Sequence, residues 1–491
     1  MRFSIRFRAS FQIALCTLAL LTAGCTRPLG PGFDFARRQA EIHAPTGAPE
    51  QVHIRITDHL VGVGNTPIRS LDVRMPDKAG FGAQNLRVTV GGREALLEQS
   101  SSVDRRLMRI EFTPAWERLE SREIVEEWDL TSEQTARGTI GFSPAGFYIA
   151  DDTALPLWQP PGQVFSTGGP TPDHETLTVI APSDFRVLAP GKQMKRRTAG
   201  NLATYRFQIH PDRDFIPYVV AGRYQEQAIR TPQGTVSFWT FQPLDAKVVQ
   251  TAAVRLSSSM QALAAFFELS NKSKTTVHVV EAPGEMHDEF GAGSDPGGTS
   301  FPEGVLLAPG AIAQGITDES VLQLAEYELA RTWFGWRVRP LREAQIVMGR
   351  GIGLFGVVVA AEARGQDQRD PMIASLLERY DAAQQIAPDK RLIEPVTGYS
   401  HNERITTGYK AALFFAMLED LCGRRNLSVA MQDIIAALGG EEAGYEDLRS
   451  AAESASGRDL SEIFRIWFNR TGIPEEFRAR YGHASNQRAR N

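Results

Sequence analysis

The chain has 491 residues, of which 23% are charged, and its formal net charge is −5. A length of this order exceeds that of an ordinary single domain, so two or three domains are expected. The mildly acidic balance and the lack of Lys/Arg-rich runs give no indication of nucleic-acid binding. Its three cysteines are too few and too scattered for a disulfide framework.

The first 24 residues have the pattern of a secretory targeting segment. Three arginines precede an apolar run, residues 11–21, that is too short to span a bilayer. Leu-Thr-Ala-Gly then leads to Cys25, and this pattern resembles the lipobox of bacterial lipoproteins, in which the cysteine is acylated. An ordinary cleaved signal peptide is the alternative.

The resemblance to a lipobox implies that Cys25 anchors the mature protein to a membrane of the bacterial cell envelope without crossing it. Thr26, rather than Asp, follows the cysteine, and by analogy with lipoprotein sorting this favours the outer membrane, facing the periplasm. Loss of the targeting segment removes three arginines and changes the formal charge from −5 to −8.

Composition and pattern divide the mature chain. Residues 25–50 contain four prolines and are predicted to form a tether. Residues 51–226 hold many short alternating segments, which predict a β-rich domain with a β-sandwich or saddle-like sheet. The remaining parts are, in order, a mixed α/β domain, a helical part and a polar tail: residues 227–370, 371–481 and 482–491. The expected fold class is therefore multidomain α+β.

Residues 321–334 have apolar side chains at helical spacing and contain no Gly or Pro, so they are predicted to form a buried helix. Tyr327 and Arg331 stand four residues apart and share one face of that helix, and Glu328 directly follows Tyr327. In metallopeptidases this geometry belongs to His-Glu-x-x-His, where two imidazoles bind zinc and the Glu activates the zinc-bound water.

The segment from Tyr327, reading YELARTWFG, resembles the HELAHQWFG segment of the aminopeptidase-N-like gluzincin metallopeptidases. In that family the third zinc ligand is a Glu after eighteen further residues, and here that position is Arg350. The resemblance implies a thermolysin-like domain in which Tyr327, Arg331 and Arg350 are vestigial metal positions. Glu328 stands at the position of the general base.

Two further motifs carry the same resemblance. The run from Gly408, reading GYKAAL, resembles the family's Y-x-K-G-A-L, and it places Gly408 where the family has the tyrosine that stabilises the oxyanion. The family's G-x-M-E-N motif supplies the Glu that holds a substrate's amino terminus. Gly284 begins a similar run here, but that run lies too far upstream, so no residue is assigned to this role.

The residues at the metal positions are unsuited to zinc, because arginine is always protonated and has no acceptor to offer a metal. Arg331 and Arg350 are instead expected to fill the metal hole and to pair with Glu328. No cofactor is therefore expected, and the chain is predicted to be a catalytically degenerate pseudo-metallopeptidase with a binding or scaffolding role.

Two other functions stay open. One is an active zinc-dependent peptidase whose metal has moved to a new set of ligands, either His287, Asp288 and Glu289 or His401 and Glu403. The other is a module that captures a peptide or an anion in the former active site without turnover.

A separate G-x-G-x-x-G match begins at Gly351, after a possible strand at residues 345–348. It lacks the repeated βαβ pattern that nucleotide binding would require.

Overall fold

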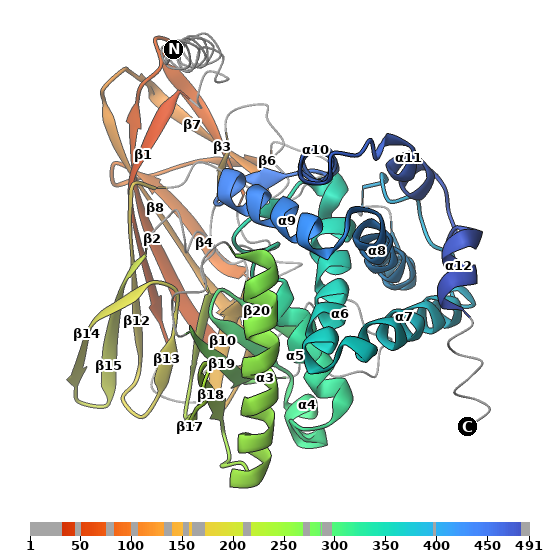
Figure 1. Ribbon diagram of the computed structural model, residues 1–491. Helices are drawn as coiled ribbons and strands as arrows, with labels where there is room; N and C mark the ends of the chain where they lie inside the picture. The colour runs from red at the N-terminus through yellow and green to blue at the C-terminus, as the bar shows by residue number, and fades with distance from the viewer. Residues whose placement is uncertain are drawn as a thin grey trace, which may run out of the picture.

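A computed structural model describes most of the chain and shows a β-rich half packed beside a helical half (Figure 1). The described residues are 32–44, 51–74, 83–99, 107–131, 140–150, 157–159, 172–209, 218–268, 275–284, 286, 297–395 and 399–482. The targeting segment, Cys25, residues 287–289 and the polar tail from residue 483 lie outside them.

The β-rich half is built on an eight-stranded sheet with the order β14-β15-β12-β1-β2-β8-β4-β5. Its strands are β1 (Phe33–His43), β2 (Gln51–Gly62), β4 (Ala83–Val90), β5 (Arg93–Glu94), β8 (Ser121–Thr131), β12 (His174–Pro182), β14 (Lys192–Ala199) and β15 (Leu202–Ile209). The apolar residues of β2 and β8 alternate with exposed or half-buried ones, so one face of the sheet is packed against the core.

Two four-stranded sheets, with the orders β13-β16-β10-β9 and β11-β3-β7-β6, complete this half. Their strands are β3 (Ile68–Arg74), β6 (Leu97–Gln99), β7 (Leu107–Trp116), β9 (Ile140–Ser143), β10 (Gly146–Ala150), β11 (Leu157–Gln159), β13 (Arg186–Leu188) and β16 (Tyr218–Gly222). Each sheet shares a separate apolar cluster with the large sheet.

A buried polar row crosses the inner face of the large sheet. Arg38 of β1 lies opposite both Glu175 of β12 and Asp58 of β2. Its guanidinium donates to the Asp58 carboxylate over 2.9 and 2.7 Å, and the indole of Trp158 donates to the same carboxylate over 2.6 Å. Glu126 of β8 is also fully buried. Ion pairing at Arg38 therefore offsets part of the cost of burying several charges in one place.

Strand β1 corrects the prediction of a tether from residue 25 to residue 50. Residues 33–43 alternate between buried and exposed positions and join the large sheet between β2 and β12. The prolines that suggested a tether stand before and after this strand. The alternating apolar side chains, such as Phe33 and Phe35, therefore determine the structure of this segment.

A five-stranded sheet with the order β17-β18-β19-β21-β20 begins the second half. Its strands are β17 (Gln225–Arg230), β18 (Gly234–Thr240), β19 (Thr275–Glu281), β20 (Gly298–Phe301) and β21 (Gly304–Leu307). The helices that follow its strands are α3 (Ala246–Phe267), α4 (Pro309–Gln314), α5 (Glu319–Ala330) and α6 (Ile352–Arg364), with the π-helical segment η4 (Gln345–Gly351) leading into α6. Two very short strands, β22 (Arg339–Pro340) and β23 (Glu442–Ala443), pair with each other.

The C-terminal part is helical, as predicted. Its elements are η5 (Gln366–Gln368), α7 (Arg369–Gln384), α8 (His401–Cys422), α9 (Arg424–Leu438), α10 (Tyr445–Ser456), α11 (Ser461–Asn469) and α12 (Glu475–Tyr481). One apolar core extends from Val236 in β18 to Tyr481 in α12, so the mixed and helical parts fold around a shared interior. The predicted α+β class, with a β-rich half, a mixed part and a helical end, is confirmed.

The long apolar segment that includes α6 is a core helix. Arg342–Arg364 is long and apolar enough to cross a membrane, but 83% of its most apolar window is buried inside the protein. Two glycines of the G-x-G-x-x-G match let this segment pack closely. A Cβ on Gly356 would overlap with that of Ala330, and a Cβ on Gly351 would lie 2.7 Å from the Ala411 Cβ. These glycines thus serve helix packing.

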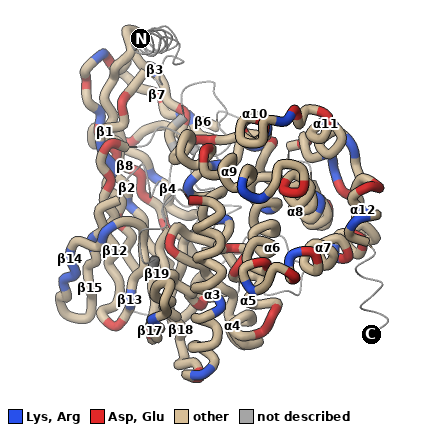
Figure 2. The backbone as a smooth tube through the Cα atoms, viewed as in Figure 1, with Lys and Arg blue, Asp and Glu red and all other residues tan. Residues whose placement is uncertain are grey.

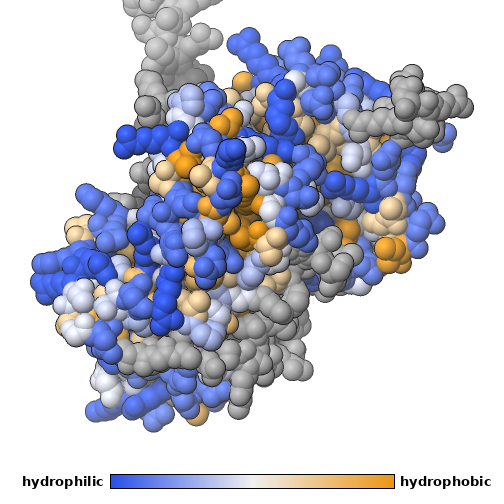
Figure 3. All heavy atoms as spheres, turned by 90° about the horizontal axis from the view of Figure 1, so that it is seen from below, coloured by the Kyte–Doolittle hydropathy of each residue, from blue (hydrophilic) through white to orange (hydrophobic). Residues whose placement is uncertain are grey.

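The surface has mixed polarity. Charges of both signs are interspersed over the strands and helices (Figure 2). The face seen from below is mainly hydrophilic, with one area of apolar side chains near its centre (Figure 3).

Candidate functional site

Helix α5 presents the first part of the candidate site. The Asp318 carboxylate caps its first turn by accepting from the Ser320 amide over 2.9 Å. The apolar side chains of Val321, Leu322 and Leu329 are buried in the core, as the helical pattern predicts. The regular helix ends at Ala330, and Arg331 is its C-terminal cap.

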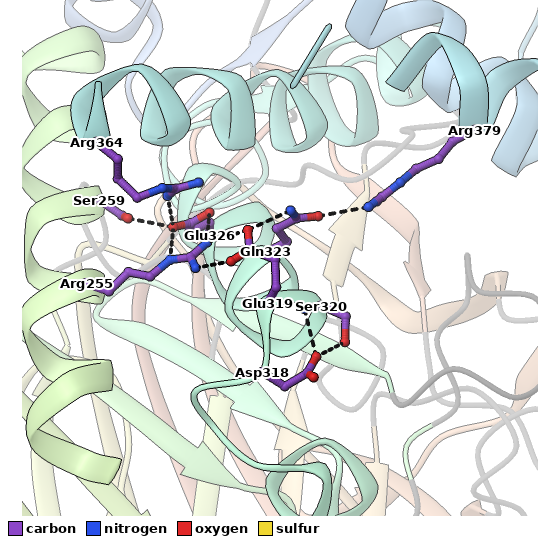
Figure 4. A network of polar contacts seen from close by, with 9 residues as sticks. All are labelled: Arg255, Ser259, Asp318, Glu319, Ser320, Gln323, Glu326, Arg364 and Arg379. Carbon is purple, nitrogen blue, oxygen red and sulfur yellow. Dashed lines mark hydrogen bonds and ion pairs between the residues drawn. The ribbon is translucent and has the colours of Figure 1, made fainter. Parts of the chain in front are cut away.

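A buried charge network fixes α5 between two neighbouring helices (Figure 4). The fully buried Glu326 carboxylate accepts from Ser259 over 2.8 Å and from Arg255 over 3.1 Å, both on α3. It also accepts from Arg364, at the end of α6, over 2.6 Å. Sequence reasoning missed this residue, although an acid among the apolar positions of a predicted buried helix is a signal that could have found it.

One end of the site is formed by three residues that follow Glu326 in the chain, namely Tyr327, Glu328 and Arg331. Glu328 has a side chain that is 2% exposed, and its two oxygens accept from Nη1 of Arg331 over 3.2 and 3.0 Å. The Arg331 guanidinium carbon lies 5.6 Å from the centroid of the Tyr327 ring. The carboxylate at the position of the general base is therefore held in an ion pair with a cation at a ligand position.

Two glycines allow close packing around Tyr327, Arg331 and Arg350. A Cβ on Gly353 would lie 2.5 Å from Cε2 of Tyr327 and 3.0 Å from Cγ of Arg331, so α6 packs directly on both side chains. A Cβ on Gly408 would overlap with Cδ and Nε of Arg350, whose side chain is buried. The structure thus packs α6 against Tyr327 and Arg331, and it packs Arg350 against Gly408 of α8.

Helix α8, which carries Gly408, is held by a buried ion pair. Lys410 Nζ lies 2.9 Å from the Asp389 carboxylate, and both side chains are almost completely buried. Lys410 also donates to the carbonyl of Arg470, and Asp389 accepts from the Gly472 amide over 2.9 Å. Burial lowers the pKa of Lys410, although Asp389 opposes that effect. Lys410 therefore positions α8.

The donor set does not fit zinc. Guanidinium groups have no lone pair for a metal, and the phenol of Tyr327 is the only other group at the three positions. Among the described residues, no group of three or more His, Cys, Asp or Glu side chains could hold a metal ion.

Of the two alternative sets of metal ligands, the structure describes only the one with His401 and Glu403. Residues 287–289 lie outside the described part of the chain. Glu403 caps α8 by accepting from the Ser400 amide over 2.7 Å, and it lies 2.7 Å from Lys390. The hydrogen bond from Lys390 lowers the pKa of Glu403 to about 2. Its carboxylate is thus already used in holding the start of α8, near His401.

Comparison with solved structures identifies proteins that share this fold. No protein-family model and no curated protein matches the sequence. An M1 zinc metallopeptidase from Deinococcus radiodurans matches with a TM-score of 0.64 and 13% identity, over 90% of this chain and 95% of that one. A mutant M1 enzyme from the same organism, bound to a Tyr-Ser-Ala substrate, matches with a TM-score of 0.61 and 14% identity over 90% and 95% of the chains.

A two-domain M1 zinc metallopeptidase mutant bound to L-arginine gives a TM-score of 0.63 and 13% identity, again over 90% and 95% of the two chains. The chain therefore has the fold of the aminopeptidase-N-like M1 zinc metallopeptidases along nearly its whole length, as its resemblance to that family implies. At this level of identity the likeness concerns the fold.

Proposed function

We propose that this protein is a lipid-anchored, catalytically degenerate protein with the fold of an M1 metallopeptidase, acting in binding or scaffolding at the bacterial cell envelope. The observation that carries the proposal is the contact between Arg350 and Gly408. The arginine at the third ligand position lies where any side chain at the oxyanion position would begin. A change at one functional position is therefore sterically linked to the change at the other.

The chemistry at Glu328 supports the same proposal. A general base of this kind acts on a metal-bound water, whose acidity depends on the metal. Here the carboxylate faces Arg331 over 3.0 Å, and a guanidinium cannot ligate such a metal. The zinc ligands and the oxyanion tyrosine are both replaced in this chain. In such an enzyme, either loss alone would remove most of the rate enhancement.

Metal analysis of the purified protein, combined with an aminopeptidase assay, tests the loss of catalysis. We expect far less than one zinc per chain and no chelator-sensitive cleavage of Tyr-Ser-Ala, the peptide bound by a structural neighbour. One tightly held zinc per chain with chelator-sensitive turnover would instead support a relocated metal site. The anchor is tested separately, by mass spectrometry of the mature N-terminus and by loss of membrane association in Cys25→Ser.

A second function, peptide binding without turnover, is favoured by the position of β20. This strand is the edge of the described five-stranded sheet, and a Cβ on Gly298 would lie only 3.5 Å from Cγ of Glu328. An extended peptide can add to a sheet edge through its main chain. Calorimetric titration with Tyr-Ser-Ala would show saturable binding that Arg350→Ala weakens, whereas an absence of heat would count against this function.

A further inference from the structure

At one end of the β-rich half, the first described residue is hydrogen-bonded to the loop that follows β2. The first described residue is Gly32, and its carbonyl accepts from the amides of Val63 and Gly64 over 2.9 and 3.0 Å. The start of the fold is therefore fixed to the loop that follows β2. We call this end of the molecule, formed by Gly32, residues 62–67 and the turn at residues 117–120, the N-terminal tip.

The turn between β7 and β8 is bound firmly into the tip. The Leu119 amide donates to the carbonyl of Gly62 over 2.7 Å, and the Gly62 amide donates to that of Glu120 over 3.1 Å. The indole of the fully buried Trp116 donates to the Glu120 carbonyl over 2.6 Å. Its ring stacks on Phe33, the first residue of β1. The conformation of the turn is thus set by a packed base.

Leu119 has two unfavourable features at this turn, its backbone conformation and its exposed apolar side chain. Its φ is +64°, a left-handed conformation that Gly and Asn adopt easily and leucine adopts at a cost. Its side chain is also 74% exposed. Exposed apolar residues such as Ile386 are ordinary when the backbone is relaxed. Among the described non-glycine residues, Asn85 is the only other one with a positive φ, and asparagine suits that conformation.

Neighbouring side chains make the tip suitable for an apolar contact. Val63 is 37% exposed and lies in the loop that shares the hydrogen bonds of Gly62 and Gly32. Charges at the turn are balanced, because Glu120 pairs with Arg122 over 2.6 Å and Arg118 follows Glu117. An exposed leucine and valine over balanced charges can enter the interface of a bilayer without a large electrostatic penalty.

The lipid anchor proposed at Cys25 would hold this tip close to a membrane. Six residues separate Cys25 from Gly32, and an extended chain over the seven Cα–Cα steps between them spans at most about 25 Å. If Cys25 is acylated, the tip is therefore the part of the described surface that is nearest to the bilayer. In Figure 1 this end of the β-rich half projects away from α3 and α4.

From these observations we infer that the N-terminal tip rests on the lipid surface, with Leu119 and Val63 inserted at the headgroup level. The inference depends on the lipid anchor of the proposed function. The contact gives the anchored protein a fixed orientation, with the peptidase-like half directed away from the membrane. Strain at Leu119 is then retained because the side chain serves the contact.

A fluorescence experiment on the full, acylated chain tests this contact. An environment-sensitive fluorophore is attached to Leu119→Cys or to the control Ile386→Cys, which is 68% exposed in the helical part, both in a Cys422→Ser background. The proteins are reconstituted into phosphatidylethanolamine/phosphatidylglycerol vesicles that contain a lipid-borne quencher. We expect several-fold stronger quenching at position 119 than at position 386.

Equal quenching at the two positions, in protein whose Cys25 acylation is verified by mass spectrometry, would overturn the inference while leaving the anchor intact. A lack of acyl chains on Cys25 would overturn the anchor itself, and the inference with it.

Leu119→Asn provides a second measurement, because asparagine accepts the left-handed conformation. We expect an unchanged or higher Tm together with several-fold weaker quenching of a label at Val63→Cys. A lower Tm with unchanged quenching would show that Leu119 serves packing and would overturn the inference.

Discussion

At the scale of single residues, the contact between Arg350 and Gly408 determines what the site can contain. Gly408→Ala adds a Cβ that overlaps with the Arg350 side chain. Because both residues are in a packed interior, we expect the free energy of unfolding to fall by about 1–3 kcal/mol. Urea denaturation measures this change.

Gly349→Ala is a matched control, since Gly349 lies beside Arg350 and a Cβ there meets nothing within 4 Å. We expect it to be neutral or slightly stabilising. In the double variant Arg350→Ala/Gly408→Ala, the cost of the new Cβ should largely disappear. An undiminished cost in the double variant would mean that something other than Arg350 restricts position 408.

Glu126 gives the β-rich half a dependence on pH. Burial, with the nearby Asp58, raises its pKa well above the ordinary value near 4.5, although Arg38 opposes this. Among the described residues neither of its carboxylate oxygens has a hydrogen-bond partner. As the pH rises above 4.5, the unfolded chain loses this proton and the folded chain keeps it. The free energy of unfolding then falls by about 1.4 kcal/mol per pH unit, until the folded-state pKa is reached.

Glu126→Gln removes this titration while leaving Arg38, Asp58 and Glu175 in place. We expect the variant to be more stable than the original protein at neutral pH, with a difference that shrinks to nearly nothing as the pH falls to 4.5. Melting temperatures across this range measure the difference. A gap that stays constant with pH would show that Glu126 is ionised in the folded protein as well.

At the scale of elements, the network around Glu326 holds α5 in register with α3 and α6. Glu326→Ala leaves the guanidinium groups of Arg255 and Arg364 without their buried acceptor. We expect a loss of about 3–5 kcal/mol in the free energy of unfolding. Glu319→Ala, which removes a carboxylate that is 60% exposed and also pairs with Arg255, should cost less than about 1 kcal/mol. Equal losses in urea denaturation would contradict a special role for Glu326.

The sequence predicted the elements of the site better than their contacts. The helical pattern placed Tyr327, Glu328 and Arg331 on one short segment, although the regular helix already ends at Ala330. Residues 345–348 were predicted as a possible strand, but they belong to the π-helical segment η4. A short apolar run does not distinguish a buried strand from a buried helix, so the packing of neighbouring elements decided the outcome.

The contact between Arg350 and Gly408 could not be predicted from the sequence, even though the resemblance to the family singled out both positions. Motif frames fix which backbone positions converge, whereas side-chain rotamers and close approaches depend on tertiary packing. The network at Glu326 was missed for a related reason. Its partners come from segments 38 to 71 residues away along the chain, where no local pattern connects them.

At the scale of the whole molecule, the stability of the fold provides a test for a bound metal. One apolar core joins the five-stranded sheet to the C-terminal helices, and ion pairs such as Lys410–Asp389 lie inside it. A metal bound only to the folded state would raise stability by about 4 kcal/mol when its free concentration is a thousand times its Kd. We therefore expect the Tm of the protein to be the same with a chelator and with added zinc.

A reverted variant shows whether this measurement could detect zinc. Tyr327→His, Arg331→His and Arg350→Glu together restore imidazole and carboxylate donors at the three positions that the resemblance to the family assigns to metal ligands. Glutamate is shorter than arginine, so it should fit over Gly408. We expect this variant to gain a Tm that rises with zinc and falls with chelator. If the original protein instead loses stability when a chelator is added, a metal bound outside the three positions stabilises its fold. That result would favour the alternative of a zinc-dependent peptidase with a relocated metal site.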